Sequence, residues 1–116
     1  MRNKLLLLIF IFCFSIQSNF AQTKKISFEV AGMCGMCQDR IEKALDIKGV
    51  KIAYWSVETK ICKVTYNSSK ISEKEIQQVI AKVGHDTPMV QANEKAYNNL
   101  HQCCRYDRVD YKKWEY

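Results

Sequence analysis

The spacing of apolar residues changes period several times along this chain, and that succession constrains the fold more than any other feature. Apolar residues alternate from Ile26 to Val30, take helical spacing from Ile41 to Leu45, alternate again over 53–57 and over 62–66, and return to helical spacing from Ile76 to Val83. A further short strand fits 87–91. The predicted order is strand, helix, strand, strand, helix, strand. This order indicates an α+β sandwich with two helices on one face of a sheet.

Local signals mark the ends of these elements. Ser72 and Glu75 have the spacing of a capping box, which starts the second helix, and Gly84 is placed to end it. Gly49 is placed to end the first helix. A short turn at 58–60 joins the two middle strands, which we therefore expect to form a hairpin.

Two cysteines, Cys34 and Cys37, lie between the first strand and the first helix. Two thiolates separated by two residues can bind one ion when the chain turns between them, and Gly35 permits that turn. The positive end of the helix dipole at Cys37 favours the thiolate form, which binds metals. Thiolates select soft ions such as Cu(I) and Zn(II), so this spacing predicts a metal site.

A cysteine pair between the first strand and helix of such a fold resembles the heavy-metal-associated (HMA) domain of copper chaperones, metal-pumping ATPases and periplasmic mercury-binding proteins. The residues that carry the resemblance are Cys34-Gly35-Met36-Cys37, the helix Arg40–Leu45, Gly49-Val50, Val64-Thr65-Tyr66 and Val83-Gly84. The resemblance covers about 24–91. It implies a ferredoxin-like βαββαβ fold with a four-stranded antiparallel sheet. It also implies a nearly linear Cu(I) site, with Cu(I) passed to a metal-transporting membrane protein or another metal-binding domain.

One position departs from the family pattern. The family usually has Gly-Met, one further residue and then the first cysteine, whereas Gly32-Met33 directly precedes Cys34 here. If the cysteines are aligned, Met33 takes the spacer position and Gly32 takes the place of the usual buried methionine. The metal pair is retained in that alignment.

Other functions of the same pair stay open. The spacing of Cys34 and Cys37 also resembles that of thiol-disulfide oxidoreductases, in which one thiolate attacks and the other resolves. That family usually has an aromatic residue before the first cysteine, where this chain has Met33, and a cis-proline strand facing the site; Pro88 is the sole proline. A scavenger of Hg(II) or Zn(II) is a further alternative. No Ser-His-Asp set or catalytic carboxylate pair is evident, so we do not expect an enzyme.

Three further residues are candidate accessory ligands. His85 follows the second helix, where the resembling family has a loop beside the metal, and it is a candidate third ligand or proton-controlled gate. Cys103 and Cys104 follow a short helical stretch at 94–100. Side chains of adjacent residues diverge, so one of these thiols would complete the main site if the tail folds back. A vicinal disulfide, a second weak site and pairing with another molecule are the alternatives.

The start of the chain has the pattern of a secretory signal. Arg2 and Lys4 precede an apolar run over 5–14, and Ala21 follows a polar stretch. We expect a signal peptide at 1–21, a heavy-metal-associated domain at 22–91 and a tail at 92–116, in a periplasmic or secreted protein; an uncleaved interfacial anchor is the alternative. Basic and acidic residues alternate without a basic stripe, so nucleic-acid binding is not expected.

The number of cysteines agrees with metal binding by an exported protein. Five of the six cysteines follow residue 21, and an odd number cannot all pair within one chain. Thiols outside the cytosol become oxidised unless something binds or reduces them. Export together with unpaired thiols therefore favours metal binding.

Overall fold

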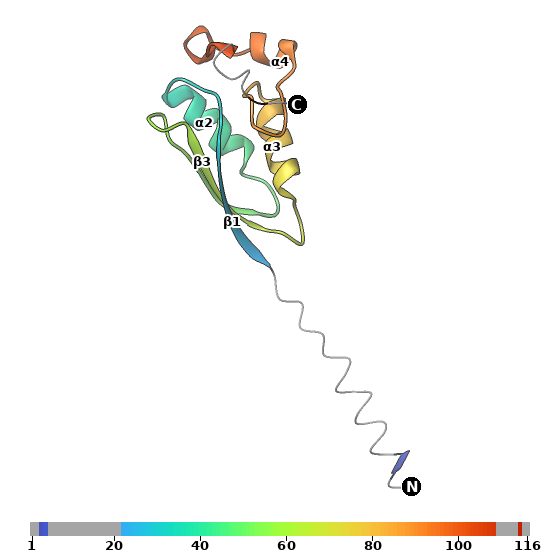
Figure 1. Cartoon of the computed structure of the whole chain (residues 1–116). Helices are drawn as coiled ribbons and strands as arrows, with labels where there is room; N and C mark the ends of the chain where they lie inside the picture. The colour runs from blue at the N-terminus through green and yellow to red at the C-terminus, as the bar shows by residue number, and fades with distance from the viewer. Residues whose placement is uncertain (1–2, 5–21, 109–113, 115–116) are drawn as a thin grey trace.

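The computed structural model of the chain describes residues 3–4, 22–108 and 114, and shows a three-stranded sheet covered by helices (Figure 1). The elements in chain order are β1 (Thr23–Glu29), α2 (Gly35–Ala44), β2 (Val50–Trp55), β3 (Ile61–Asn67), α3 (Glu73–Lys82), α4 (Glu94–Asn98) and the 3-10 turn η1 (Gln102–Cys104). None of the helices in the described part has the length and apolar character of a bilayer span. The expected signal segment 1–21 lies outside the described residues, apart from 3–4.

The sheet has the strand order β1-β3-β2, and both pairings are antiparallel. The predicted hairpin of β2 and β3 is confirmed, and its turn places Lys60 at a φ of 63°. On the central strand, Cys62 lies opposite both Phe28 of β1 and Trp55 of β2. Cys62 is fully buried, as its alternation with apolar neighbours predicted.

The core lies between the sheet and helices α2 and α3. Ile41 of α2 and Ile76 and Ile80 of α3 have no exposed surface, and they belong to one cluster with Trp55 and Val64 of the sheet. Burying an aliphatic side chain of this size contributes roughly 1.5–3 kcal/mol. The amphipathic faces predicted from helical spacing therefore supply the core.

The predicted helix start at Ser72 is confirmed, with Ser72 as the N-cap of α3. The Ser72 hydroxyl accepts the N–H of Glu75 at 3.1 Å and donates to its carboxylate at 3.2 Å. At the other end, Gly84 has a φ of 107°, and a Cβ there would lie 2.8 Å from the carbonyl of Ala96 in α4. Gly84 thus ends α3 and allows α4 to pack directly against the loop that follows.

The four-stranded sheet is not found in the described residues, because 87–91 forms a turn instead of a strand. The N–H of Thr87 and its hydroxyl both donate to the carbonyl of Val90, and the Val90 N–H donates to that hydroxyl. Pro88 within the turn has no N–H to offer a neighbouring strand. Just before this segment, the Asp86 carbonyl accepts the N–H of Ala31, which follows β1. The α+β fold is confirmed, with three strands.

The tail folds back over the loop between β1 and α2. The helical stretch expected over 94–100 is present as α4 (Glu94–Asn98), and Leu100 just beyond it is buried. In Figure 1 the orange and red segment of α4 and η1 crosses the end of the domain where α2 begins. This path brings the last cysteines of the chain toward the first pair.

Candidate metal centre

The start of α2 holds the cysteine pair close together. Cys34 is the N-cap residue, and its carbonyl accepts the backbone N–H groups of Cys37 at 3.0 Å and Gln38 at 3.2 Å. The Sγ atoms of Cys34 and Cys37 lie 3.7 Å apart. Cys34 is half-buried and Cys37 is fully buried. The loop thus presents one thiol to the surface and one to the interior.

Trp55 supports the loop before the pair. Its indole N–H donates to the carbonyl of Val30 at 3.1 Å, and the Val30 N–H donates to the carbonyl of Lys60 at 2.8 Å. A Cβ at Gly32 would lie 2.8 Å from the Trp55 ring, so the indole occupies the space beneath the loop. Met33 is 50% exposed and does not fill that space. Trp55 therefore supports the loop from beneath.

The tail adds two more thiols to the pair. Cys104 Sγ lies 3.4 Å from Cys34 Sγ, and Cys103 Sγ lies 3.7 Å from the same atom. The sulfurs of Cys34, Cys37 and Cys104 all lie within 4.8 Å of one another; we call these three the sulfur cluster. Cys104 is fully buried, whereas Cys103 is exposed and lies 3.4 Å from Met36 Sδ. The structure thus brings both tail cysteines to Cys34, and their role as ligands stays a prediction.

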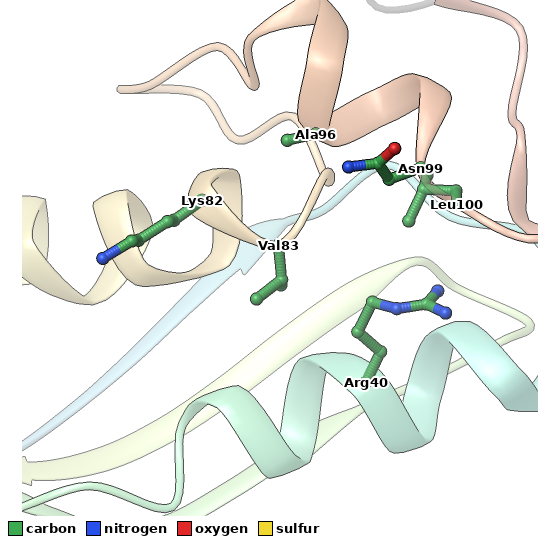
Figure 2. Close-up of a pocket in the computed structure, with 6 residues that line it drawn as sticks. All are labelled: Arg40, Lys82, Val83, Ala96, Asn99 and Leu100. Carbon is green, nitrogen blue, oxygen red and sulfur yellow. The ribbon is translucent and has the colours of Figure 1, made fainter.

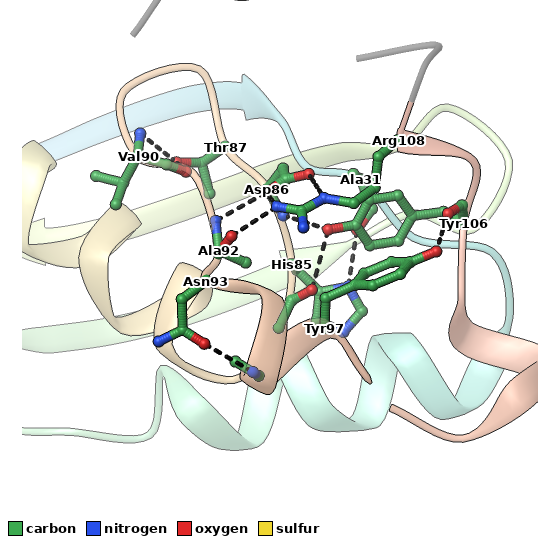
Figure 3. A network of polar contacts seen from close by, with 12 residues as sticks. Ala31, His85, Asp86, Thr87, Val90, Ala92, Asn93, Tyr97, Tyr106 and Arg108 are labelled. Atoms are coloured by element: carbon green, nitrogen blue, oxygen red, sulfur yellow. Dashed lines mark hydrogen bonds and ion pairs between the residues drawn. The ribbon is translucent and has the colours of Figure 1, made fainter. Parts of the chain in front are cut away.

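A network of buried polar contacts holds the tail in this position (Figure 3). The Tyr106 hydroxyl accepts the N–H of Asp86 at 2.9 Å and donates to the carbonyl of Gly84 at 3.0 Å. Arg108 forms an ion pair with the Asp86 carboxylate at 2.9 and 3.0 Å. Tyr97 donates its hydroxyl proton to the carbonyl of Tyr106, and Arg108 stacks on the Tyr97 ring at 4.9 Å. No motif in the sequence indicated this network.

His85 is buried in the structure and is not part of the sulfur cluster. Its Nδ1 donates to the carbonyl of Ala31 at 2.7 Å, its ring stacks on Tyr106, and its buried Nε2 has no partner among the described residues. Burial lowers the pKa of His85 to about 4 against the effect of the bond to Ala31, and the charge of Arg40 lowers it further. A proton gate near the ordinary imidazole pKa of about 6.5 is therefore not supported. Its role as a ligand stays a prediction.

Hydrogen bonds favour the thiolate of Cys34. Burial opposes ionisation, but the Cys37 N–H and the thiols of Cys104, Cys37 and Cys103 outweigh it and lower the pKa of Cys34 to about 7. A thiol with this pKa is substantially ionised near neutral pH. Because the thiolate is the form that binds metals, Cys34 is prepared to act as a ligand.

Arg40 of α2 lies beneath the tail, and Figure 2 shows its side chain extending from the helix toward Leu100. An open cavity of about 240 Å³ there is lined by Arg40, Lys82, Val83, Ala96, Asn99 and Leu100. Burial raises the pKa of Cys104, and the bonds to Cys37 and Cys34 act in the same direction, whereas a hydrogen bond from Arg40 opposes them. Arg40 therefore places a positive charge near Cys104.

The donors gathered here suit soft ions. The cluster consists only of sulfur, and no carboxylate or imidazole of the described residues joins it. Thiolates bind Cu(I) and Zn(II), whereas hard ions such as Mg²⁺ and Ca²⁺ prefer oxygen. All five cysteines of the described part are free thiols. The residues present therefore fit a soft metal ion as cargo.

Solved structures with the same fold include metal-binding proteins. A "CopZ metallochaperone" is 30% identical and has a TM-score of 0.53, and the match covers 55% of this chain and 98% of that one. The Cu(I)-loaded N-terminal domain of a potential copper-translocating P-type ATPase from Bacillus subtilis is 32% identical, with a TM-score of 0.54. That match covers 57% of this chain and 85% of the other.

A curated relative and a family model agree with these structures. A Haemophilus influenzae protein named "Probable cation-transporting ATPase" is 37% identical over 75 residues, which are 63% of this chain and 10% of that protein. The chain thus spans about a tenth of the length of this relative. The model of the "Heavy-metal-associated domain" matches residues 27–86. Because this match spans more than half of the chain, the protein belongs to the heavy-metal-associated domain family.

Proposed function

We propose that this protein is exported and binds Cu(I) through Cys34 and Cys37, for trafficking or sequestration of the ion. The observation that carries the proposal is the pair of sulfurs 3.7 Å apart at the start of α2, in a cluster that contains only thiols. Membership of the heavy-metal-associated family supports binding of a soft metal. The similarity to a domain solved in its Cu(I)-loaded state supports copper.

Anaerobic titration of Cu(I) against a chromophoric chelator tests the proposal. We expect the protein to compete for one equivalent of Cu(I), and the double variant Cys34→Ser, Cys37→Ser to lose that competition. Cys62→Ala is the matched control, because Cys62 is buried in the sheet core and is not part of the sulfur cluster. A double variant that competes as well as the wild-type protein would contradict the proposal.

The identity of the ion and the redox alternative need separate measurements. Paired thiolates also accept Zn(II) and Hg(II), so the metal content of the protein purified anaerobically from its exported fraction decides among them. The lowered pKa of Cys34 would also suit a nucleophile in thiol-disulfide exchange. Catalysed reduction of insulin would favour that alternative, and we expect none.

Export and delivery to a membrane transporter complete the proposal. The charged, apolar and polar order of residues 1–21 supports a signal peptide, and the resulting protein would begin near Gln22 in the periplasm or outside the cell. The similarity to a cation-transporting ATPase supports such a transporter, or another metal-binding domain, as the partner. Mass spectrometry of the protein from the producing cell tests export. An intact mass that still includes Arg2 to Ala21 would contradict cleavage.

A further inference from the structure

We propose that Cys104 is a third sulfur ligand, so that the tail closes a three-coordinate site over the Cys34–Cys37 pair. This inference rests on the proposed function, since it adds a ligand to the same site. It differs from the nearly linear two-thiolate site that the family resemblance implies.

The distances fit three ligands better than two. An ion bonded to three sulfurs in one plane at about 2.3 Å, the length of zinc–thiolate bonds, holds them about 4.0 Å apart, whereas a linear pair needs about 4.6 Å. The Sγ of Cys34 lies 3.7 Å from that of Cys37 and 3.4 Å from that of Cys104. All three sulfurs lie within 4.8 Å of one another. To reach that spacing, the Cys34–Cys37 separation would widen by about 0.3 Å and the Cys34–Cys104 separation by about 0.6 Å.

Burial distinguishes the two tail cysteines. In η1 the N–H of Cys104 donates to the carbonyl of His101 at 2.8 Å, and the Cys104 side chain is fully buried. Cys103 is exposed, and its sulfur lies 3.7 Å from that of Cys34 and 3.4 Å from the exposed Met36 Sδ. It is not among the three sulfurs that all lie within 4.8 Å of one another. Cys104 is therefore the buried third ligand, and Cys103 lies on the exposed side of Cys34.

Arg40 supplies a charge that such a site requires. Three thiolates around a monovalent ion leave a net negative charge, which is costly to bury without a counter-charge. The guanidinium of Arg40 favours the thiolate of Cys104, and its buried Nη1 has no partner among the described residues. Two thiolates around a monovalent ion leave one negative charge and three leave two, so the third sulfur increases the need for a positive group nearby. The position of Arg40 favours an anionic cluster that includes Cys104.

The tail is fixed directly beyond the proposed ligand. The N–H of Tyr106 donates to the carbonyl of Cys104 at 2.9 Å, and the Tyr106 hydroxyl bonds the loop that follows α3 through Asp86 and Gly84. Tyr106 itself is 2% exposed. The third sulfur is thus held in position before an ion binds, which reduces the ordering cost of closing the site.

X-ray absorption spectroscopy on the full exported chain, loaded with one equivalent of Cu(I), tests the proposal. We expect three sulfur ligands in the wild-type protein and in Cys103→Ser, and two in Cys104→Ser. Cys103→Ser is a matched control because the same residue type is removed one position away. In chelator competition we expect Cys104→Ser to bind Cu(I) roughly tenfold or more weakly than Cys103→Ser, the scale of changes to metal-site surroundings.

The outcomes separate this inference from the proposed function. Two sulfurs in the wild-type protein, or three in Cys104→Ser, would overturn the role of Cys104 while leaving the Cys34–Cys37 site in place. If the Cys34→Ser, Cys37→Ser variant retains full affinity, the proposed function fails instead. Circular dichroism and urea unfolding of each variant establish that it is folded, so that loss of a ligand is distinguished from unfolding.

Discussion

Lowering the pH destabilises the fold through His85. The neutral ring donates from Nδ1 to the carbonyl of Ala31 and leaves Nε2 buried without a partner. Protonation of Nε2 would bury a charged donor near the guanidinium of Arg40. Asp86, the other charged group that acts on His85, favours the charge, and Tyr106 covers the ring. The pKa of His85 is accordingly lowered to about 4.

The direction of the pH effect on stability follows from the imidazole pKa in the folded and in the unfolded state. In the unfolded chain the imidazole pKa is about 6.5, so between pH 6.5 and about 4 the unfolded state binds a proton that the folded state does not. The stabilisation is fully present above pH 6.5 and is lost as the pH falls to about 4. The difference of about 2.5 pKa units corresponds to about 3 kcal/mol in total, and to about 2 kcal/mol at pH 5.

Urea unfolding of the wild-type protein and of His85→Gln between pH 7.5 and 4.5 measures this contribution. The glutamine amide can still donate to Ala31 but does not titrate, so the wild-type protein should lose about 2 kcal/mol more than the variant between pH 7.5 and 5. Parallel stability curves for the two proteins would refute the reasoning. If the variant does not fold, an NMR titration of the wild-type imidazole decides, and a midpoint near 6.5 would likewise refute it.

Two further predictions concern the loop and the tail. Gly32→Ala should lower the free energy of unfolding by about 1–3 kcal/mol, because its Cβ would meet the buried Trp55 ring. Gly35→Ala is the control and should change stability little, because the space around Gly35 is open. Equal thermal unfolding of the two variants would contradict this prediction. Tyr106→Phe removes the hydroxyl that serves two buried backbone groups and should cost roughly 2–5 kcal/mol in urea unfolding. The exposed Tyr54→Phe is its control, and an equal effect of both changes would contradict the role of the Tyr106 hydroxyl.

Local patterns predicted most of the fold because they report on burial and backbone bonding within one element. The alternation that placed Cys62 inward and the helix start at Ser72 are both confirmed. The predicted strand at 87–91 was wrong, since an apolar residue at Val90 does not reveal whether the backbone bonds to a neighbouring strand. Thr87 satisfies the backbone of Val90 locally, so the segment closes on itself.

The sequence predicted the position of some residues of the candidate site and not of others. Cys34 and Cys37 are close in sequence and lie at a helix start, so their proximity followed from local structure. The position of Cys104 depends on where the tail runs, which no periodicity encodes. The loop position of His85 suggested a ligand, but its burial depends on Tyr106, which lies far along the chain. Contacts between distant segments are what the sequence patterns could not supply.

One residue accounts for much of this long-range arrangement. Asp86 is the last residue matched by the family model. It forms bonds both to the loop before Cys34 and to the tail. Its carbonyl accepts the Ala31 N–H from the loop before Cys34, while its N–H and carboxylate bind Tyr106 and Arg108 of the tail. The family match ends where the connection to the tail begins, so likeness to the family cannot by itself show a third sulfur. Because the same residue holds both the loop and the tail, the spacing between the Cys34 and Cys104 sulfurs depends on a few short bonds rather than on a long free segment.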